Sequence, residues 1–346
     1  RRPSPHDGAN GAAEETIAGF FTRRLGGEAY RRVVEPLMAG IHAGDAARLS
    51  LPATFPRFLD LERAHGGLVR ATLAGSVPKP LRRKASRRNG GPPLGAPAAG
   101  RTPFVSFATG MADLIDALVT RLTALGVDLR LHQPVADIRA VGGGYEVVVE
   151  TGSAVPAGAV VVATPAPVAA RLLRALCPAA AALLEGIEHA STATVSLAYR
   201  RDDVGTPPAG YGFVVPRAEG RHLLAGTWGS NKWPGRAPDD LVLVRGYVGG
   251  VGREAVLEAD DDGLVHLVRA ELGALAGITG TPVHREVHRY PQGMPQYNVG
   301  HLARVERIRG ALAACPGLLV TGAPYNGVGI PDCIADALAT ARQLRT

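Results

Sequence analysis

A glycine-rich turn near the end of the chain constrains the fold more than any other stretch. It reads LLVTGAPYNGVGIPDCIA over residues 318–335. The apolar start predicts a short buried strand. Pro331 and Asp332 predict the first turn of a helix, because proline tolerates that position and an acid complements the helix dipole. Gly327 and Gly329 let the backbone approach a ligand closely, so free amides would face an electron-rich group, and a reduced flavin with its negatively charged pyrimidine edge would suit them.

The bulk composition indicates a large protein with mixed architecture. The chain has 346 residues, 46% of them apolar, which is enough for a large core and two domains or lobes. Strands alternate with helices, so we expect an α/β mixed fold. No Cys-x-x-Cys pair occurs, and isolated cysteines fit a reducing compartment, the cytoplasm. These cysteines are Cys177, Cys315 and Cys333.

Membrane-spanning and secretory segments are not expected. Pro165 and Pro167 interrupt the best apolar run, at residues 160–162, and the chain opens on a polar segment without a signal peptide. Because the chain starts at Arg1 rather than at a methionine, we expect that its own beginning is missing.

A basic segment at residues 75–101 accounts for the whole net charge of +7. It contains seven lysines and arginines and no acid, together with many Gly, Pro and Ala residues. This composition predicts a disordered loop rather than a nucleic-acid surface, because no aromatic residues are interleaved with the charges. Peripheral contact with an acidic membrane is left open.

Hydrophobic periodicity predicts the order of the elements. Helices are expected within residues 14–73, with one interrupted near Pro36, and at 111–125, 262–275, 303–314 and after Pro331. Strands are expected at 104–107, 127–131, 145–149, 160–163 (fully buried), 194–199, 212–215, 223–227, 241–248, 283–290 and 318–320, with a turn at Gly142–Gly144.

Metal and hydrolase chemistry are not expected. His284 and His288 lie four apart, but in the predicted strand that spacing separates them by roughly 13 Å. No Gly-x-Ser-x-Gly elbow and no cysteine nucleophile signature occurs. Cofactor chemistry is therefore the better interpretation.

Several blocks resemble one enzyme family, in the same order along nearly the whole chain. They are residues 34–45 (VEPLMAGIHAGD), 49–50, 53–56 (ATFP), 164–167 (TPAP), 227–234 (TWGSNKWP) and 294–301 (MPQYNVGH), with the closing turn. These blocks resemble the oxygen-dependent protoporphyrinogen and coproporphyrinogen oxidases of the FAD-dependent amine-oxidase superfamily. The resemblance implies four segments: a mainly helical lobe over 1–103 with the loop at 75–101, an FAD-domain segment over 104–170, an antiparallel substrate lobe over 171–300, and a strand–loop–helix of the FAD domain over 301–346.

The resemblance also implies positions for the cofactor and the substrate. The FAD contacts would be main-chain atoms of Val135 and of the closing turn, and a packing position; they are Val135, Leu302, Gly327, Val328, Gly329 and Ile330. The porphyrinogen contacts would line a cavity wall, with two cations for propionates; they are Tyr211, Gly212, Val214, Thr227, Lys232, Arg245 and Tyr247. No acid–base residue is named, because the cavity needs shape and apolar contact more than a strong base.

One departure from the family pattern affects the cofactor. The expected Gly-x-Gly-x-x-Gly turn is absent from residues 1–30, and Thr109-Gly110 replaces an expected Gly-Gly pair. We therefore expect either a fragment of a longer enzyme or a truncated form, and poor FAD binding by the chain as given.

The predicted function is FAD-dependent oxidation of coproporphyrinogen III in haem biosynthesis, with oxygen as acceptor and hydrogen peroxide as product. Residues 227–234 resemble the bacterial branch, and a substrate with more carboxylates would favour Lys232 and Arg245. The alternatives are protoporphyrinogen IX oxidation, an amine-oxidase-like flavoenzyme, and a truncated inactive flavoprotein acting as a binding module. The oligomeric state is not predicted.

Overall fold

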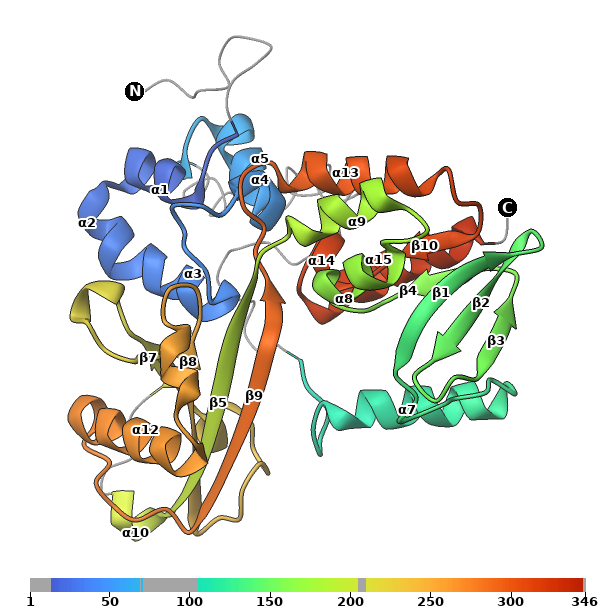
Figure 1. The fold of residues 1–346 in the computed structure, drawn as a ribbon. Helices are drawn as coiled ribbons and strands as arrows, with labels where there is room; N and C mark the ends of the chain where they lie inside the picture. Colours follow the sequence, from blue (N-terminus) through green and yellow to red (C-terminus); the bar gives the residue numbers. More distant parts are fainter. Residues whose placement is uncertain (1–13, 69, 71–104, 205–209, 345–346) are drawn as a thin grey trace, which may run out of the picture. The chain divides into compact units, whose positions relative to one another are not determined.

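The computed structural model describes residues 14–68, 70, 105–204 and 210–344 (Figure 1). The chain divides into two compact units. Phe55–Leu129 forms the smaller unit, and Arg1–Thr54 with Arg130–Thr346 forms the larger one. Each unit is described by itself below. No helix among the described residues has both the length and the apolar character needed to cross a membrane.

The smaller unit contains the helices α5 (Pro56–His65) and α7 (Ala112–Ala124). The helix predicted at 111–125 is confirmed, and Gly126 follows it with a positive φ of 76°. The strand predicted at 104–107 is wrong for its described residues, 105–107, which have no regular structure. The basic segment at 75–101 lies outside the described residues.

The larger unit begins with a run of helices. They are α1 (Ile17–Leu25), α2 (Gly27–Ala29), the π-helical turn η1 (Tyr30–Val34), α3 (Glu35–His42) and α4 (Leu51–Thr54). Thr16 caps α1, since its hydroxyl accepts a hydrogen bond from the Gly19 amide at 3.0 Å. The predicted interruption near Pro36 is the π-helical turn, which ends just before the proline enters the first turn of α3.

A small antiparallel sheet follows, in the order β1-β2-β3. Its strands are β1 (Val135–Val141), β2 (Gly144–Val149) and β3 (Ala154–Ala157). The strand predicted at 145–149 is confirmed as β2, and Gly142 and Gly143, with φ of 58° and 86°, form the predicted tight turn before it. The other arm of this hairpin is β1, which the sequence did not predict. The strand predicted at 127–131 is wrong, because β2 pairs instead with β1 on one side and with β3 on the other, and Val127, Leu129 and Leu131 are exposed.

Two short parallel strands form the sheet below the glycine-rich turn. They are β4 (Val160–Val162) and β10 (Leu318–Val320). Helices α8 (Ala166–Leu173), α9 (Pro178–Glu185) and α13 (His301–Leu312) share a core with Val162, Leu318 and Val320. The prediction of a fully buried strand is wrong in one respect. Val161 alternates to the opposite side from that core and is 38% exposed.

The largest sheet is antiparallel and has the order β6-β7-β8-β5-β9. Its strands are β5 (His189–Arg200), β6 (Gly212–Val214), β7 (Leu223–Trp228), β8 (Leu241–Gly249) and β9 (His284–Pro295). All five were predicted, and β5 and β9 run side by side over much of their length (Figure 1). The helix α12 (Asp261–Ala276) covers one side, where Leu264, Val268 and Leu272 pack with the apolar side chains of β5 and β8.

The remaining helices are short connections, except the last one. They are α10 (Arg201–Val204), η3 (Arg217–Glu219), α11 (Gly229–Lys232), η4 (Glu254–Glu258), α14 (Ala323–Asn326) and α15 (Ile330–Gln343). The helix predicted after Pro331 is therefore confirmed as α15. Its buried residues are Asp336 and Thr340, whereas Ile334 and Leu338 are 47% and 55% exposed.

Candidate cofactor loop and substrate face

The segment between β10 and α15 presents unpaired amides at the start of a long helix. Gly327 has a φ of 138°, a value that L side chains rarely adopt, and a Cβ atom there would lie 2.5 Å from the Asp332 Cβ atom. Within the part of the chain that the structure describes, the amides of Val328, Gly329 and Ile330 have no hydrogen-bond acceptor. These amides and the positive end of the α15 dipole suit an electron-rich ligand group.

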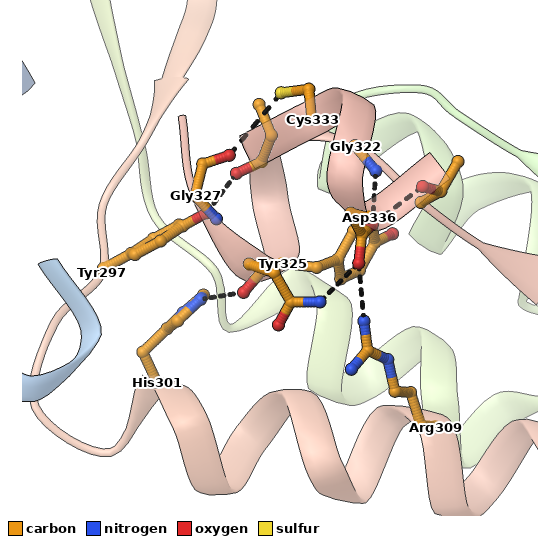
Figure 2. Close-up of polar contacts among 11 residues, drawn as sticks. Tyr297, His301, Arg309, Gly322, Tyr325, Gly327, Cys333 and Asp336 are labelled. Atoms are coloured by element: carbon orange, nitrogen blue, oxygen red, sulfur yellow. Dashed lines mark hydrogen bonds and ion pairs between the residues drawn. The ribbon is translucent and has the colours of Figure 1, made fainter. Parts of the chain in front are cut away.

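Tyr297 and His301 hold this loop from one side (Figure 2). The Tyr297 hydroxyl donates to the Ala323 carbonyl at 2.5 Å and accepts from the Gly327 amide at 2.7 Å. Its ring stacks on the His301 imidazole at 3.9 Å. The His301 Nε2 atom lies 3.2 Å from the Tyr325 carbonyl, to which it donates as a neutral imidazole. Burial lowers the pKa of His301 to about 4, so the ring stays neutral at physiological pH.

Asp336 holds the loop from the other side (Figure 2). One carboxylate oxygen accepts from the Thr321 hydroxyl at 2.8 Å and from the Gly322 amide at 3.1 Å. The other accepts from the Arg309 guanidinium at 3.0 Å and from the Asn326 side-chain amide. This buried carboxylate therefore joins β10, the loop, α13 and α15, with donors satisfying both of its oxygens.

The six positions proposed for FAD all belong to the larger unit. Gly327, Val328, Gly329 and Ile330 form the loop just described, and Leu302 is an exposed residue beside His301. Val135 starts β1 and packs against the core cluster that contains Tyr325. Its carbonyl accepts a hydrogen bond from the Arg171 guanidinium at 3.0 Å. The cofactor contacts of these residues stay predictions.

Most positions proposed for the porphyrinogen share one side of the five-stranded sheet. Gly212 is paired with Thr227, and Thr227 with Arg245. Val214 and Tyr247 are both paired with Ala225, in the next row. Directly opposite residues of an antiparallel sheet point to the same side, and this is the side away from α12. We call it the polar face, defined by Thr194, Ser196, Gly212, Val214, Thr227, Arg245 and Tyr247.

The cations and the edge residue of the predicted set differ in their surroundings. Arg245 is exposed on the polar face, where its Nε atom donates to the Ser196 hydroxyl at 3.0 Å. Lys232 lies at the end of α11, with its ammonium 5.7 Å from the centre of the Trp233 ring. Tyr211 is exposed just before β6. The structure therefore groups Arg245 with the strand residues and leaves Lys232 on a separate element.

Sequence reasoning missed the residues that shape the loop. Tyr297 and His301 lie in the block at 294–301, which resembles the family pattern but does not indicate contacts with the loop. Asp336 carried no signal, because an acid inside a helix is usually solvated. Its buried position and its several donors become evident only when α13, β10 and α15 are seen side by side in the fold.

Comparison with known proteins gives a consistent result. The sequence matches the family described as flavin containing amine oxidoreductase over residues 3–345. Coproporphyrinogen III oxidase of Bacillus subtilis (strain 168) is 34% identical over 335 residues, which are 96% of this chain and 68% of that protein. The chloroplastic protoporphyrinogen oxidase of Nicotiana tabacum is 30% identical and is covered to 63%, with 99% of this chain aligned. The chain spans about two thirds of the length of these relatives.

Solved structures agree on the fold. A crystal structure from Exiguobacterium sp. 255-15, described as a candidate protoporphyrinogen oxidase, has a TM-score of 0.80 at 27% identity, covering 100% of this chain and 70% of that one. Reduced UDP-galactopyranose mutase has a TM-score of 0.62 at 13% identity, covering 92% and 64%. The predicted α/β fold class, family and flavin cofactor class are confirmed. This chain belongs to the flavin-containing amine oxidoreductase family.

Proposed function

We propose that this protein uses FAD to oxidise coproporphyrinogen III to coproporphyrin III in haem biosynthesis. Oxygen is the proposed electron acceptor, hydrogen peroxide the second product, and the cytoplasm the proposed location. The observation that carries the proposal is the row of unpaired amides at Val328, Gly329 and Ile330, ahead of α15. Relatives named coproporphyrinogen III oxidase, at 34% and 33% identity, support the choice of substrate.

The loop residues fit FAD through their backbone. The Val328, Gly329 and Ile330 amides would donate to the electron-rich edge of the flavin ring, and the glycines leave room for close approach. Val135 and Leu302 are proposed to contact other parts of the cofactor. Bound FAD supplies the redox chemistry, and the residues of this chain bind and orient it.

The polar face is proposed to bind the porphyrinogen. Its strand residues Gly212, Val214, Thr227 and Tyr247 offer a surface of mixed polarity for a macrocycle, and the exposed Tyr211 ring precedes β6. Arg245 would pair with a propionate carboxylate, since Ser196 holds the guanidinium through one nitrogen and the other two have no acceptor among the described residues. Lys232 is proposed for a second propionate. We assign no general base, because Tyr297 and His301 are buried and hydrogen-bonded within the loop.

The second candidate substrate is protoporphyrinogen IX. It is favoured by the chloroplastic protoporphyrinogen oxidases of Nicotiana tabacum and Arabidopsis thaliana, which are each 30% identical to this chain. The two substrates differ in their number of carboxylates, so the cations on and near the polar face bear directly on the choice.

A turnover experiment tests the function. The full-length gene product, loaded with FAD, is incubated aerobically with each porphyrinogen while porphyrin fluorescence and hydrogen peroxide are followed. We expect faster formation of coproporphyrin, with peroxide formed in parallel. Faster formation of protoporphyrin would favour the second candidate. A protein that binds FAD but oxidises neither porphyrinogen would refute the function and point to the amine-oxidase-like alternative, whereas one that binds no flavin would favour an inactive binding module.

A further inference from the structure

The Tyr297 hydroxyl binds both ends of α14, the short helix within the loop. The hydroxyl donates at 2.5 Å to the carbonyl of Ala323, the first residue of α14. It accepts at 2.7 Å from the amide of Gly327, the residue directly after α14. A helix of four residues is not stable by itself, because the entropy lost in fixing its backbone dihedral angles exceeds the stabilisation from a single turn of hydrogen bonds. The Ala323 carbonyl and the Gly327 amide are four residues apart, the spacing of a helical hydrogen bond, and the hydroxyl bridges these two groups.

The geometry of Gly327 depends on this contact. Its φ of 138° is one that glycine adopts without a strong preference over other values, so the backbone alone does not select it. The bond from the Gly327 amide to Tyr297 orients the Asn326–Gly327 peptide unit, which lies one residue before the Val328 amide. Losing that bond would release several backbone dihedral angles next to the unpaired amides.

Tyr297 is itself well fixed. Its side chain is 2% exposed, its ring stacks on His301 at 3.9 Å, and its carbonyl accepts from the Ser50 amide at 2.8 Å. Burial raises the pKa of its hydroxyl above the usual range, so the hydroxyl keeps the proton that it donates. Because the Tyr297 side chain is fixed by these contacts, its hydroxyl can hold the loop backbone in one position.

We propose that Tyr297 is a positioning residue for the flavin, because its hydroxyl holds the Val328–Ile330 amides in the direction in which they bind the ring. This inference rests on the proposed function, in which those amides bind FAD. It assigns a role to a residue outside the positions predicted to contact the cofactor or the substrate.

The chain offers a closely matched control in Tyr325. This tyrosine lies within α14 and is 0% exposed, yet among the described residues its hydroxyl has no hydrogen-bond partner. Tyr297→Phe and Tyr325→Phe each delete one buried hydroxyl from the same small region. They differ in whether that hydroxyl holds the backbone of the loop.

The test measures FAD affinity by flavin fluorescence quenching, using the full-length gene product stripped of cofactor. We expect Tyr297→Phe to weaken FAD binding about tenfold, as the loss of one or two hydrogen bonds implies, and Tyr325→Phe to bind within about twofold of the unaltered protein. At saturating FAD, the visible absorption bands of the bound flavin should shift in Tyr297→Phe and stay unchanged in Tyr325→Phe. Thermal unfolding of the cofactor-free forms reports any general loss of stability separately.

The possible outcomes distinguish a failure of the Tyr297 role from a failure of the proposed function. Equal FAD affinity and equal spectra for both variants and the unaltered protein would overturn the role of Tyr297 and leave the proposed function intact. Equal weakening in both variants would also overturn it, because packing rather than the hydroxyl contact would then matter. An unaltered protein that takes up no FAD would refute the proposed function, and this inference with it.

Discussion

Replacing Asp336 with asparagine tests whether one buried carboxylate holds the loop together. Asparagine has nearly the same shape, but it exchanges a charged acceptor oxygen for an amino group with two donors. Every recorded partner of Asp336 is a donor: the Thr321 hydroxyl, the Gly322 amide, the Arg309 guanidinium and the Asn326 amide. Whichever way the new side chain turns, its amino group faces donors instead of acceptors.

The size of the effect follows from which partners can move. The Arg309 side chain is 44% exposed and Asn326 is also exposed, so both can turn to water, whereas the Gly322 amide cannot. The least costly arrangement places the amino group towards Arg309 and keeps the Thr321 and Gly322 bonds as weaker neutral ones. Losing two bonds to a charged acceptor, partly offset by hydration, costs about 3 kcal/mol. A change of that size lowers Tm by about 4 °C in a protein of this size.

The assay is urea denaturation of the unaltered protein and of Asp336→Asn at neutral pH. Glu306→Gln is the control, because Glu306 is an exposed acid on α13, the helix of Arg309, and should change stability by less than about 0.5 kcal/mol. Combining Asp336→Asn with Arg309→Gln should cost less than the sum of the single changes, since both remove the same bond. A fall in stability below about 1 kcal/mol for Asp336→Asn, or full additivity in the double variant, would refute the reasoning.

Three further predictions concern the loop, pH dependence and the polar face. Gly327→Ala should abolish FAD binding and destabilise the fold by about 2 kcal/mol or more, because its φ is 138° and a methyl group would collide with the first turn of α15. The control Gly310→Ala, with open space around the new methyl group, should be neutral or stabilising. FAD titration and urea denaturation measure both variants. His301, neutral when folded with a pKa lowered from 6.5 to about 4, should make stability fall as the pH drops from 6.5 to 4, because only the unfolded chain takes up the proton. Urea titrations should show that His301→Gln loses roughly 3 kcal/mol less over that interval, and an unchanged pH dependence would contradict this. Arg245→Gln should raise KM for coproporphyrinogen about tenfold with little change in kcat, while Arg289→Gln, on the opposite side of the sheet where Arg289 bonds to Asp261, should change neither in steady-state kinetics.

The alternating strands were the most predictable part of the fold. Residues 194–199, 223–227 and 241–248 were predicted correctly because each has an apolar side that pairs and packs against α12. The stretch at 127–131 has a similar alternation and forms no strand. Alternation shows that a segment could lie on a sheet, but whether a partner strand is available depends on the rest of the chain.

Helical periodicity has a corresponding limit, which α15 illustrates. The apolar spacing of Ile334 and Leu338 correctly predicts a helix, yet these residues are exposed and Asp336 and Thr340 are buried. Periodicity identifies the residues that share a side of a helix, whereas the contacts made by neighbouring elements select the side that is buried. The role of Asp336 as a shared acceptor therefore could not be read from its position.

The residues of the glycine-rich loop are by themselves enough to predict its local chemistry. Glycines at 327 and 329, a proline at 331 and the helix formers after it are enough to predict free amides at a helix N-terminus, because backbone freedom and helix initiation are properties of short segments. The contacts that hold those amides in one direction come from Tyr297 and Asp336, which reach the loop from a preceding segment and from the following helix. Hydrogen bonds act over about 3 Å, so such partners become known when the folded chain brings them within that distance.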